Sequence, residues 1–358
     1  MSMSTLIDSV TSGTAQECAF SAKDLKPAGD VRWCAGCGNY SVLSQVQKLL
    51  PELGVPRENI AFISGIGCSS RFPYYMNTYG FHTIHGRAAA VASGLKVARP
   101  DLSVWVVTGD GDALSIGGNH TIHLLRRNID LNVLLFNNQI YGLTKGQYSP
   151  TSQHGQITKS SPSGMPGYPF DPVSLALGAG ASFVARTLDR DLRHLGVMLR
   201  RAAEHKGTSF LEIYQNCVVF NDGAFENFTD KATKPENTLF LEHGKPLVFG
   251  ANSEKAIRLD GVEPRVISLG DGEHSVSDAL VYDETNPNLA FIIAGMSRNP
   301  DLPRPVGVFL AVERPCFEEE LTAQIQADAQ KYSTDKPFEP SLEALFASED
   351  EWTVALHN

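Results

Sequence analysis

The chain has 358 residues, of which 42% are hydrophobic and 20% are charged. This composition is ordinary for a globular protein, and the length permits one large domain with an extension, or two domains. The formal net charge of -10 argues against nucleic acid as a partner. No stretch approaches ~20 uninterrupted apolar residues, and no basic region followed by an apolar run opens the chain. We therefore expect no membrane span, no secretory signal and a cytoplasmic protein.

Apolar, β-prone runs alternate with helix-like stretches in the first two thirds of the chain. We expect strands over 61–64, 104–108, 131–136, 182–185 and 209–214, and helices over 86–98, 114–127, 172–177 and 189–205. Such alternation predicts an α/β fold, a mostly parallel, doubly wound sheet with helices on both faces. Between them, residues 149–170 form a long Ser-, Gly- and Pro-rich loop, and long loops in compact domains are often functional.

The two ends of the chain differ from this pattern. Residues 1–25 are predicted to be a loose N-terminal arm, because they open with a Ser- and Thr-rich stretch. Residues 26–226 form the predicted main domain. Over 227–358 the alternation weakens, so we expect a C-terminal extension with a late helix over 321–331.

The strongest motif is Gly109-Asp110-Gly111 at the end of a predicted strand. The glycines allow a tight turn and close approach to a phosphate, and Asp110 offers a carboxylate oxygen. Asn138 follows the next predicted strand, and the Ile140 backbone carbonyl lies two residues further on. Oxygen ligands of these kinds, with phosphate oxygens, suit Mg²⁺. A lone GDG triplet is more often a simple turn, but the paired Asn and the polar, Gly-rich segment after it favour a diphosphate–metal site.

Six cysteines are present, and four of them stand out: two form a CxxC motif, one follows a glycine-containing turn at a strand end, and one follows the predicted strand over 209–214. These four are Cys34, Cys37, Cys68 and Cys217. The ends of parallel strands lie along one sheet edge, so the four can converge near the diphosphate site. Their spacing alone leaves zinc, a thiol redox pair and an iron–sulfur cluster open. Cys18 and Cys316 match no motif and are expected to be single free thiols.

Two longer segments carry a family resemblance. Residues 109–120 (GDGDALSIGGNH) and 137–147 (NNQIYGLTKGQ) resemble the thiamine-diphosphate-binding β subunits of 2-oxoacid:ferredoxin oxidoreductases, and the likeness extends over residues 33–222. It implies that Asp110, Asn138 and the Ile140 carbonyl hold Mg²⁺, and that the four cysteines hold one [4Fe–4S] cluster. The cofactor-binding residues that it implies are Gly109, Asp110, Gly111, Asp112, Asn138, Ile140, Gly142, Leu143 and Thr144. His85 is a candidate for contact with the reacting part of the cofactor or the substrate.

The resemblance also implies a reaction and partners. The reaction is the reversible oxidative decarboxylation of a 2-oxoacid with coenzyme A, which gives an acyl-CoA, CO₂ and reduced ferredoxin. The segment from 69 to 87 is most similar to 2-oxoglutarate-type members, with pyruvate and branched-chain 2-oxoacids as alternatives. A separate α subunit is expected to supply the aminopyrimidine half of the site and the activating glutamate, in a heterodimer or heterotetramer.

Two rival hypotheses make different predictions. A non-oxidative thiamine lyase or synthase half would contain no iron and would need no electron acceptor. A structural-zinc protein that uses the GDG loop only as a turn would contain zinc and no thiamine diphosphate. The presence of both groups of residues in one chain favours the ferredoxin-coupled enzyme.

Overall fold

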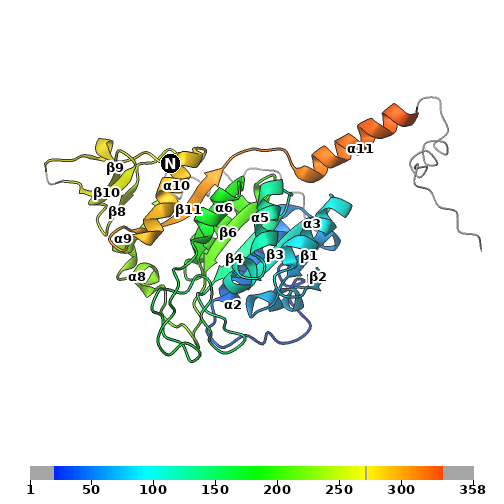
Figure 1. Cartoon of the computed structure of the whole chain (residues 1–358), viewed down its shortest axis with the longest axis horizontal. Helices are drawn as coiled ribbons and strands as arrows, with labels where there is room; N and C mark the ends of the chain where they lie inside the picture. Colours follow the sequence, from blue (N-terminus) through cyan, green and yellow to red (C-terminus); the bar gives the residue numbers. More distant parts are fainter. Residues whose placement is uncertain (1–19, 271, 334–358) are drawn as a thin grey trace, which may run out of the picture.

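A computed structural model describes residues 20–270 and 272–333 of the chain. Its centre is an eight-stranded sheet of order β2-β1-β3-β4-β6-β5-β11-β7 (Figure 1). The strands are β1 (Ile60–Ser64), β2 (Tyr79–His82), β3 (Ser103–Gly109), β4 (Asn132–Asn137), β5 (Phe183–Leu188), β6 (Ser209–Tyr214), β7 (Thr238–Leu241) and β11 (Arg304–Ala311). All neighbouring pairs are parallel except β11 with β5. The predicted mostly parallel sheet is therefore confirmed.

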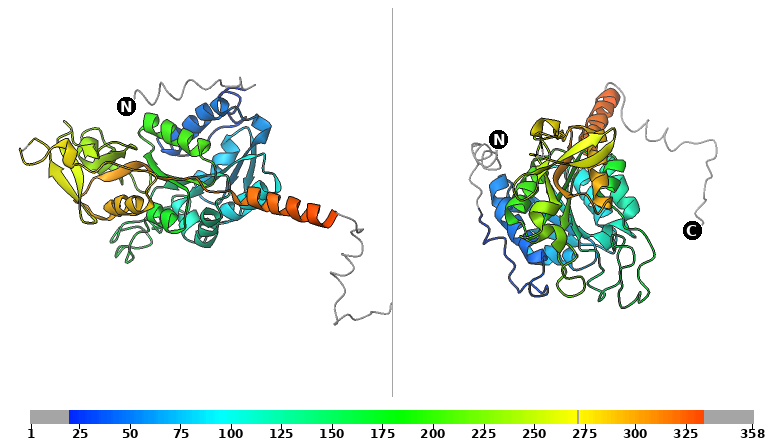
Figure 2. Two further views of the ribbon diagram at one scale, coloured as in Figure 1. Left: turned by 90° about the horizontal axis from the view of Figure 1, so that it is seen from above. Right: turned by 90° about the vertical axis from the view of Figure 1, so that its left-hand side faces the viewer.

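Helices cover both faces of this sheet (Figure 2). One face carries α2 (Asn39–Leu49) and α7 (Leu192–Glu204), and the other carries α3 (Ala88–Ala98), α5 (Gly118–Arg127), α6 (Pro172–Gly178) and α10 (Pro287–Gly295). In β3, Val104 and Val106 pack into the core on the α3 side, while Trp105 and Val107 pack into the core on the α2 side. A strand buried on both faces is apolar throughout, which is why these strands read as continuous apolar runs.

The helix expected over 114–127 begins later in the structure. A separate short helix, α4 (Asp110–Leu114), ends where it was expected to start, and α5 begins only at Gly118. The chain turns between them because Gly117 packs against Gly86: a Cβ on Gly117 would lie 2.4 Å from the Asp112 carbonyl oxygen, and one on Gly86 would lie 2.6 Å from the Gly117 nitrogen. Gly86 also has φ +71°, so α3 starts at Ala88 and not at the expected residue 86.

The C-terminal part of the chain contributes to the same sheet. Strands β7 and β11 come from residues beyond 226, so the sheet crosses the boundary expected between domain and extension. The rest of this part forms α8 (Glu226–Thr229), α9 (Lys234–Asn237) and a separate antiparallel sheet of β8 (Val248–Phe249), β9 (Lys255–Asp260) and β10 (Glu263–Ser268). The expected late helix is α11 (Phe317–Ser333), which projects from the body (Figure 1).

Short 3-10 helices complete the described structure. They are η1 (Leu50–Leu53), η2 (Arg57–Asn59), η3 (Ser69–Tyr75), η4 (Val276–Asp278) and η5 (Met296–Arg298). Cys18 and most of the predicted N-terminal arm lie outside the described residues. Within residues 20–270 and 272–333, no helix has the length and apolar character that a membrane crossing requires.

Tyr282 tests whether β11 is an integral part of the sheet. Its buried hydroxyl lies 2.9 Å from the Val308 carbonyl and 2.7 Å from the Phe309 carbonyl, so its one hydrogen is shared between them, where the β11–β5 register shifts. Tyr282→Phe leaves these acceptors without that donor and should lower the free energy of unfolding by about 1–2 kcal/mol, measured by urea denaturation of the full chain. Tyr79→Phe, at an exposed ring, should leave the midpoint unchanged. Equal midpoints for the two variants would contradict the prediction.

Candidate active site at the strand ends

Four adjacent parallel strands, β1, β3, β4 and β6, end at the same edge of the sheet. Gly109 pairs with Phe136, so Asp110 follows one strand beside the place where Asn138 follows the next. Asn137 pairs with Tyr214, which brings the segment after β6 to the same edge. Ligands of open α/β sheets bind at such an edge.

Asp110 is buried at this edge and is held by two hydroxyls from the long loop. Its Oδ2 accepts hydrogen bonds from Ser149 (2.5 Å) and Thr151 (2.6 Å). The Thr151 hydroxyl also lies 2.9 Å from Oδ1 of Asn137, so it joins the ends of β3 and β4. Burial raises the pKa of Asp110 to about 6, and the two hydroxyls oppose that rise. A cation at this position would stabilise the ionised carboxylate.

Asn138 and Ile140 complete a set of oxygen donors. The Asn138 Oδ1 accepts the Ile140 N–H (3.2 Å), and its Nδ2 donates to Oε1 of Gln215 (3.0 Å). The side-chain oxygen therefore faces the turn that carries the Ile140 carbonyl. A carboxylate, an amide oxygen and a backbone carbonyl are ligands that suit Mg²⁺ beside a diphosphate. The chemistry of the predicted Mg²⁺ residues fits the ion.

Residues 141–147 form a compact loop next to this donor set. Tyr141 donates its N–H to the Gln147 carbonyl (2.8 Å), and its hydroxyl donates to the Gly111 carbonyl (3.1 Å). A Cβ on Gly111 would lie 2.2 Å from the Tyr141 ring, so only glycine fits there. Leu143 is exposed at the tip, and the Thr144 hydroxyl donates to the Gln147 side chain. The loop thus presents Gly142, Leu143 and Thr144 at the strand edge, where the resemblance expects a diphosphate.

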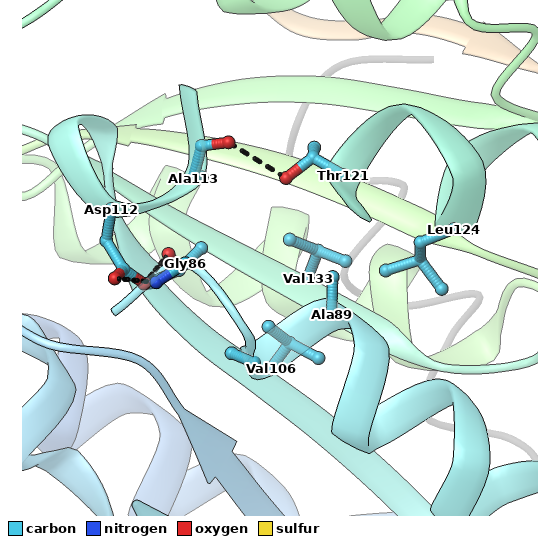
Figure 3. Close-up of a pocket in the computed structure, with 10 residues that line it drawn as sticks. Gly86, Ala89, Val106, Asp112, Ala113, Thr121, Leu124 and Val133 are labelled. Carbon is cyan, nitrogen blue, oxygen red and sulfur yellow. Dashed lines mark hydrogen bonds between the residues drawn. The ribbon is translucent and has the colours of Figure 1, made fainter. Parts of the chain in front are cut away.

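Asp112 connects three segments of the site, and Figure 3 shows its hydrogen bond with Gly86. Its Oδ1 accepts the N–H groups of Ile66 (3.0 Å) and Gly86 (2.7 Å), and its Oδ2 accepts the Thr108 hydroxyl (2.7 Å). A Cβ on Gly65 would lie 1.8 Å from Oδ2, so this turn closes directly on the carboxylate. We infer that Asp112 positions the turn before Cys68, and its contact with the diphosphate stays a prediction.

His85 reaches the site through the same carboxylate. Its Nδ1 forms a short hydrogen bond with Oδ1 of Asp112, and 38% of its side chain is exposed. The ring lies edge-on to Tyr141 at 6.4 Å between centroids. Because Nδ1 is held by Asp112, the other ring nitrogen is the one left to meet a ligand. His85 therefore remains a candidate for contact with substrate or cofactor.

The four predicted cysteine ligands converge beside the loop of residues 141–147. A Cβ on Gly142 would lie 3.6 Å from Sγ of both Cys68 and Cys217. The Cys37 N–H donates to the Cys34 carbonyl (3.1 Å), which closes the CxxC turn. Cys34 is exposed and the other three are partly buried. Gly142 therefore lies beside both Cys68 and Cys217, and thiols brought together in this way suit a metal centre bound through sulfur.

Burial and the neighbouring thiols raise the pKa of two of these cysteines. Burial raises the pKa of Cys37 to about 12, and the neighbouring charges of Cys217, Cys68 and Cys34 add to this. Burial also raises the pKa of Cys68 to about 11, with further contributions from Cys217 and Cys34. Crowded thiols of this kind are costly to ionise alone, and binding to a cationic metal centre removes that cost.

A buried polar chain that sequence reasoning missed runs away from Asp110. Asn137 donates from Nδ2 to Oε1 of Glu212 (2.7 Å), and Glu212 accepts the Arg186 Nε–H (2.6 Å). Arg186 also donates from Nη2 to Oδ1 of Asp171 (3.1 Å). Asp171 is the N-cap of α6, at the end of the long loop. Both ends of that loop are therefore attached to one network, since Thr151 and Asp171 lie near its two ends. The available signal was Glu212, a charged residue inside the apolar strand predicted over 209–214.

Comparison with known proteins agrees with this arrangement. Residues 65–213 match the family model described as thiamine pyrophosphate enzyme, C-terminal TPP binding domain. The chain is 50% identical over 335 residues to the 2-oxoglutarate oxidoreductase subunit KorB of Mycobacterium tuberculosis, across 93% of this chain and 88% of that protein.

The chain belongs to the family of 2-oxoacid:ferredoxin oxidoreductase β subunits. Another member, the β subunit from Saccharolobus solfataricus, is 43% identical over 201 residues, 56% of this β subunit and 66% of that protein. A solved 2-oxoglutarate:ferredoxin oxidoreductase from Magnetococcus marinus, with 2-oxoglutarate, coenzyme A and succinyl-CoA bound, matches with a TM-score of 0.72 and 31% identity. That match covers 92% of this chain and 97% of the other. The β subunit is thus an oxidoreductase component with a thiamine-diphosphate-binding domain.

Thr151→Val tests the hydroxyls that hold Asp110. Valine keeps the shape but cannot donate to Asp110, so we expect Mg²⁺–thiamine diphosphate to bind about 10- to 100-fold more weakly in titration calorimetry. Thr151→Ser should restore the affinity. Thr208→Val is the matched control, because Thr208 is also buried and donates to the Ile129 carbonyl (2.6 Å), beside the start of β4 and away from the site. Equal losses in Thr151→Val and Thr208→Val would contradict the prediction.

The raised pKa of Asp110 predicts a pH dependence of cofactor-metal binding. Below pH about 6 the carboxyl is protonated, and a proton must leave before Mg²⁺ can bind. Affinity for Mg²⁺ should therefore be constant above pH 7 and fall by up to about tenfold per pH unit below 6. The free energy of unfolding of the metal-free protein should instead rise as pH falls through 6, because the buried carboxyl of Asp110 is more stable in its neutral form. Calorimetric titrations from pH 5 to 8 that show constant affinity would contradict this.

Proposed function

We propose that this β subunit, joined to an α subunit, converts 2-oxoglutarate and coenzyme A to succinyl-CoA, CO₂ and a proton. Two oxidised ferredoxins each gain one electron, and the reaction is reversible. The name of the Mycobacterium tuberculosis relative and the ligands of the Magnetococcus marinus structure support 2-oxoglutarate as the substrate. Pyruvate and branched-chain 2-oxoacids are the alternatives, because the partner subunit shapes part of the pocket.

The observation that carries the proposal is the set of four cysteines beside Gly142. We infer that Cys34, Cys37, Cys68 and Cys217 hold one [4Fe–4S] cluster, in which each thiolate binds a different iron. A non-oxidative thiamine enzyme has no use for such a set. Among residues 20–270 and 272–333, no three His, Cys, Asp or Glu side chains surround a single ion position. Structural zinc requires its ligands around one ion, whereas a cluster spreads them apart.

The oxygen donors support the second cofactor assignment. Asp110, Asn138 and the Ile140 carbonyl would hold Mg²⁺, and the backbone of 141–147 with Thr144 would bind the diphosphate. When bound, thiamine diphosphate supplies an electron sink for decarboxylation. The protein's part is to fix that cofactor at the strand edge. Asp112 accepts hydrogen bonds from the Ile66 and Gly86 N–H groups, and these fix the turn before Cys68 relative to the cofactor site.

An α subunit is the partner that the site requires. The described residues supply a diphosphate half, and the aminopyrimidine half with its activating glutamate is expected on the other chain. Large exposed apolar side chains lie in the loops around the site: Ile116, Leu143, Tyr148, Ile157, Tyr168 and Phe170. Such a concentration of apolar groups fits a surface that a partner covers. We propose a heterodimer or heterotetramer, with this chain inactive alone.

Activity of the complex tests the reaction. The two subunits are co-expressed, purified without oxygen and assayed for ferredoxin reduction with coenzyme A and each of 2-oxoglutarate, pyruvate and 2-oxoisovalerate. We expect the highest kcat/KM for 2-oxoglutarate and no turnover by the β subunit alone. Decarboxylation that proceeds without an electron acceptor, in a complex that lacks iron, would show a non-oxidative enzyme instead.

Cys217→Ser tests the proposed cluster ligand that lies furthest along the chain from the other three. We expect the variant complex to lose bound iron and ferredoxin reduction, while it still binds thiamine diphosphate, because serine is a poor ligand for a cluster held by thiolates. Cys316→Ser is the control, since Cys316 is buried near the start of α11 and lies close to Asp130 and Glu318, not to the other thiols. Wild-type iron content in Cys217→Ser would remove Cys217 from the ligand set.

A further inference from the structure

Gln215 lies between the metal donors and the cysteines. It follows β6, its backbone N–H donates to the Asn137 carbonyl (2.9 Å), and its side chain is buried. A Cβ on Gly38 would lie 3.0 Å from its Cγ, so the side chain packs against the CxxC segment. The end of β6 on one side and the CxxC segment on the other therefore fix the position of Gln215.

The two ends of the Gln215 amide contact different sites. Oε1 accepts the Asn138 Nδ2–H (3.0 Å), and Nε2 donates to Sγ of Cys37 (3.5 Å), a normal length for a sulfur acceptor. The second Nε2 hydrogen goes to the Asn216 carbonyl. One side chain thus connects a proposed Mg²⁺ ligand to a proposed cluster ligand.

Ligand chemistry sets the direction of this chain of amides. A cation binds the oxygen of an amide and not its NH₂ group, so a metal on Asn138 Oδ1 turns Nδ2 toward Gln215. Gln215 must then offer Oε1 to Asn138, which leaves Nε2–H directed at Cys37. The same cation polarises both amides and strengthens the final N–H···S bond, because linked hydrogen bonds reinforce one another.

We propose that Gln215 is a positioning residue that couples occupancy of the Mg²⁺–thiamine diphosphate site to the reduction potential of the cluster. An N–H donor to a ligand sulfur stabilises the more negative, reduced cluster and so raises its potential. Cofactor binding then makes the cluster a better electron acceptor at the moment when substrate electrons become available. This inference rests on the proposed function, since it requires both cofactors.

A potentiometric titration followed by low-temperature EPR measures this coupling in the oxygen-free αβ complex. The wild-type midpoint potential should rise when Mg²⁺–thiamine diphosphate is added. Gln215→Met keeps the side-chain length and removes all three side-chain hydrogen bonds, including those to Asn138 and Cys37, so its midpoint should be lower and should not respond to the cofactor. Its affinity for Mg²⁺–thiamine diphosphate should also fall about tenfold, because Asn138 loses an outer partner.

Two further variants separate coupling from structure. Gln47→Met is the matched control: Gln47 is also buried, and its Nε2 donates to the carbonyls of Tyr75 (3.3 Å) and Leu25 (3.5 Å), not to sulfur. It should behave as wild type. Gln215→Glu still accepts from Asn138 but has no N–H for Cys37, so it should bind the cofactor with near wild-type affinity and show a lowered midpoint. This variant decides the outcome if Gln215→Met yields no folded complex.

The possible results distinguish the inference from the proposed function. A wild-type complex without a cluster signal, or without thiamine diphosphate binding, overturns both. A wild-type complex that carries both cofactors, beside Gln215 variants whose midpoint and response equal those of wild type, overturns only the role of Gln215.

Discussion

The carboxyl ends of β1, β3, β4 and β6 meet at one edge of the sheet, and the site depends on that constraint. Each strand end delivers one component: Cys68 after β1, Asp110 after β3, Asn138 after β4 and Cys217 after β6. Parallel pairing in a fixed register determines their spacing before any side chain contributes. Residues almost 150 positions apart in the chain therefore act within one small volume.

Buried polar groups then fix the loops that follow these strands. Arg186 and Glu212 are almost fully buried, and removing such charges from water is costly unless every partner is in place. Here the guanidinium contacts two carboxylates and the Ser297 hydroxyl, and Glu212 also accepts from Asn137. The network therefore stabilises one arrangement of the loop that places Thr151 on Asp110. The buried Arg186–Glu212 pair therefore acts to position this loop specifically.

The sequence predicted the central strands, and the places of Asp110 and Asn138 at strand ends, because those signals are local. Asp110 and Asn138 follow apolar runs directly, and the strand-end argument correctly placed Cys217 near Cys68. The contacts of Thr151 and Gln215 were not predictable, because they depend on the path of a long loop and on packing between strands. The hydrogen bonds of Asp112 to Ile66, Gly86 and Thr108 were not predictable either, because they join three separate segments of the chain. The pattern beyond residue 226 was too weak to show that β11 joins the sheet.

The central claim is that one metal cluster and one diphosphate site share this sheet edge. Anomalous diffraction at the iron absorption edge, from crystals of the complex grown without oxygen, tests it most directly. The account predicts a compact iron peak enclosed by Cys34, Cys37, Cys68 and Cys217, next to Gly142. A peak elsewhere in the complex with none at these cysteines, or a single zinc ion in this position, would contradict it.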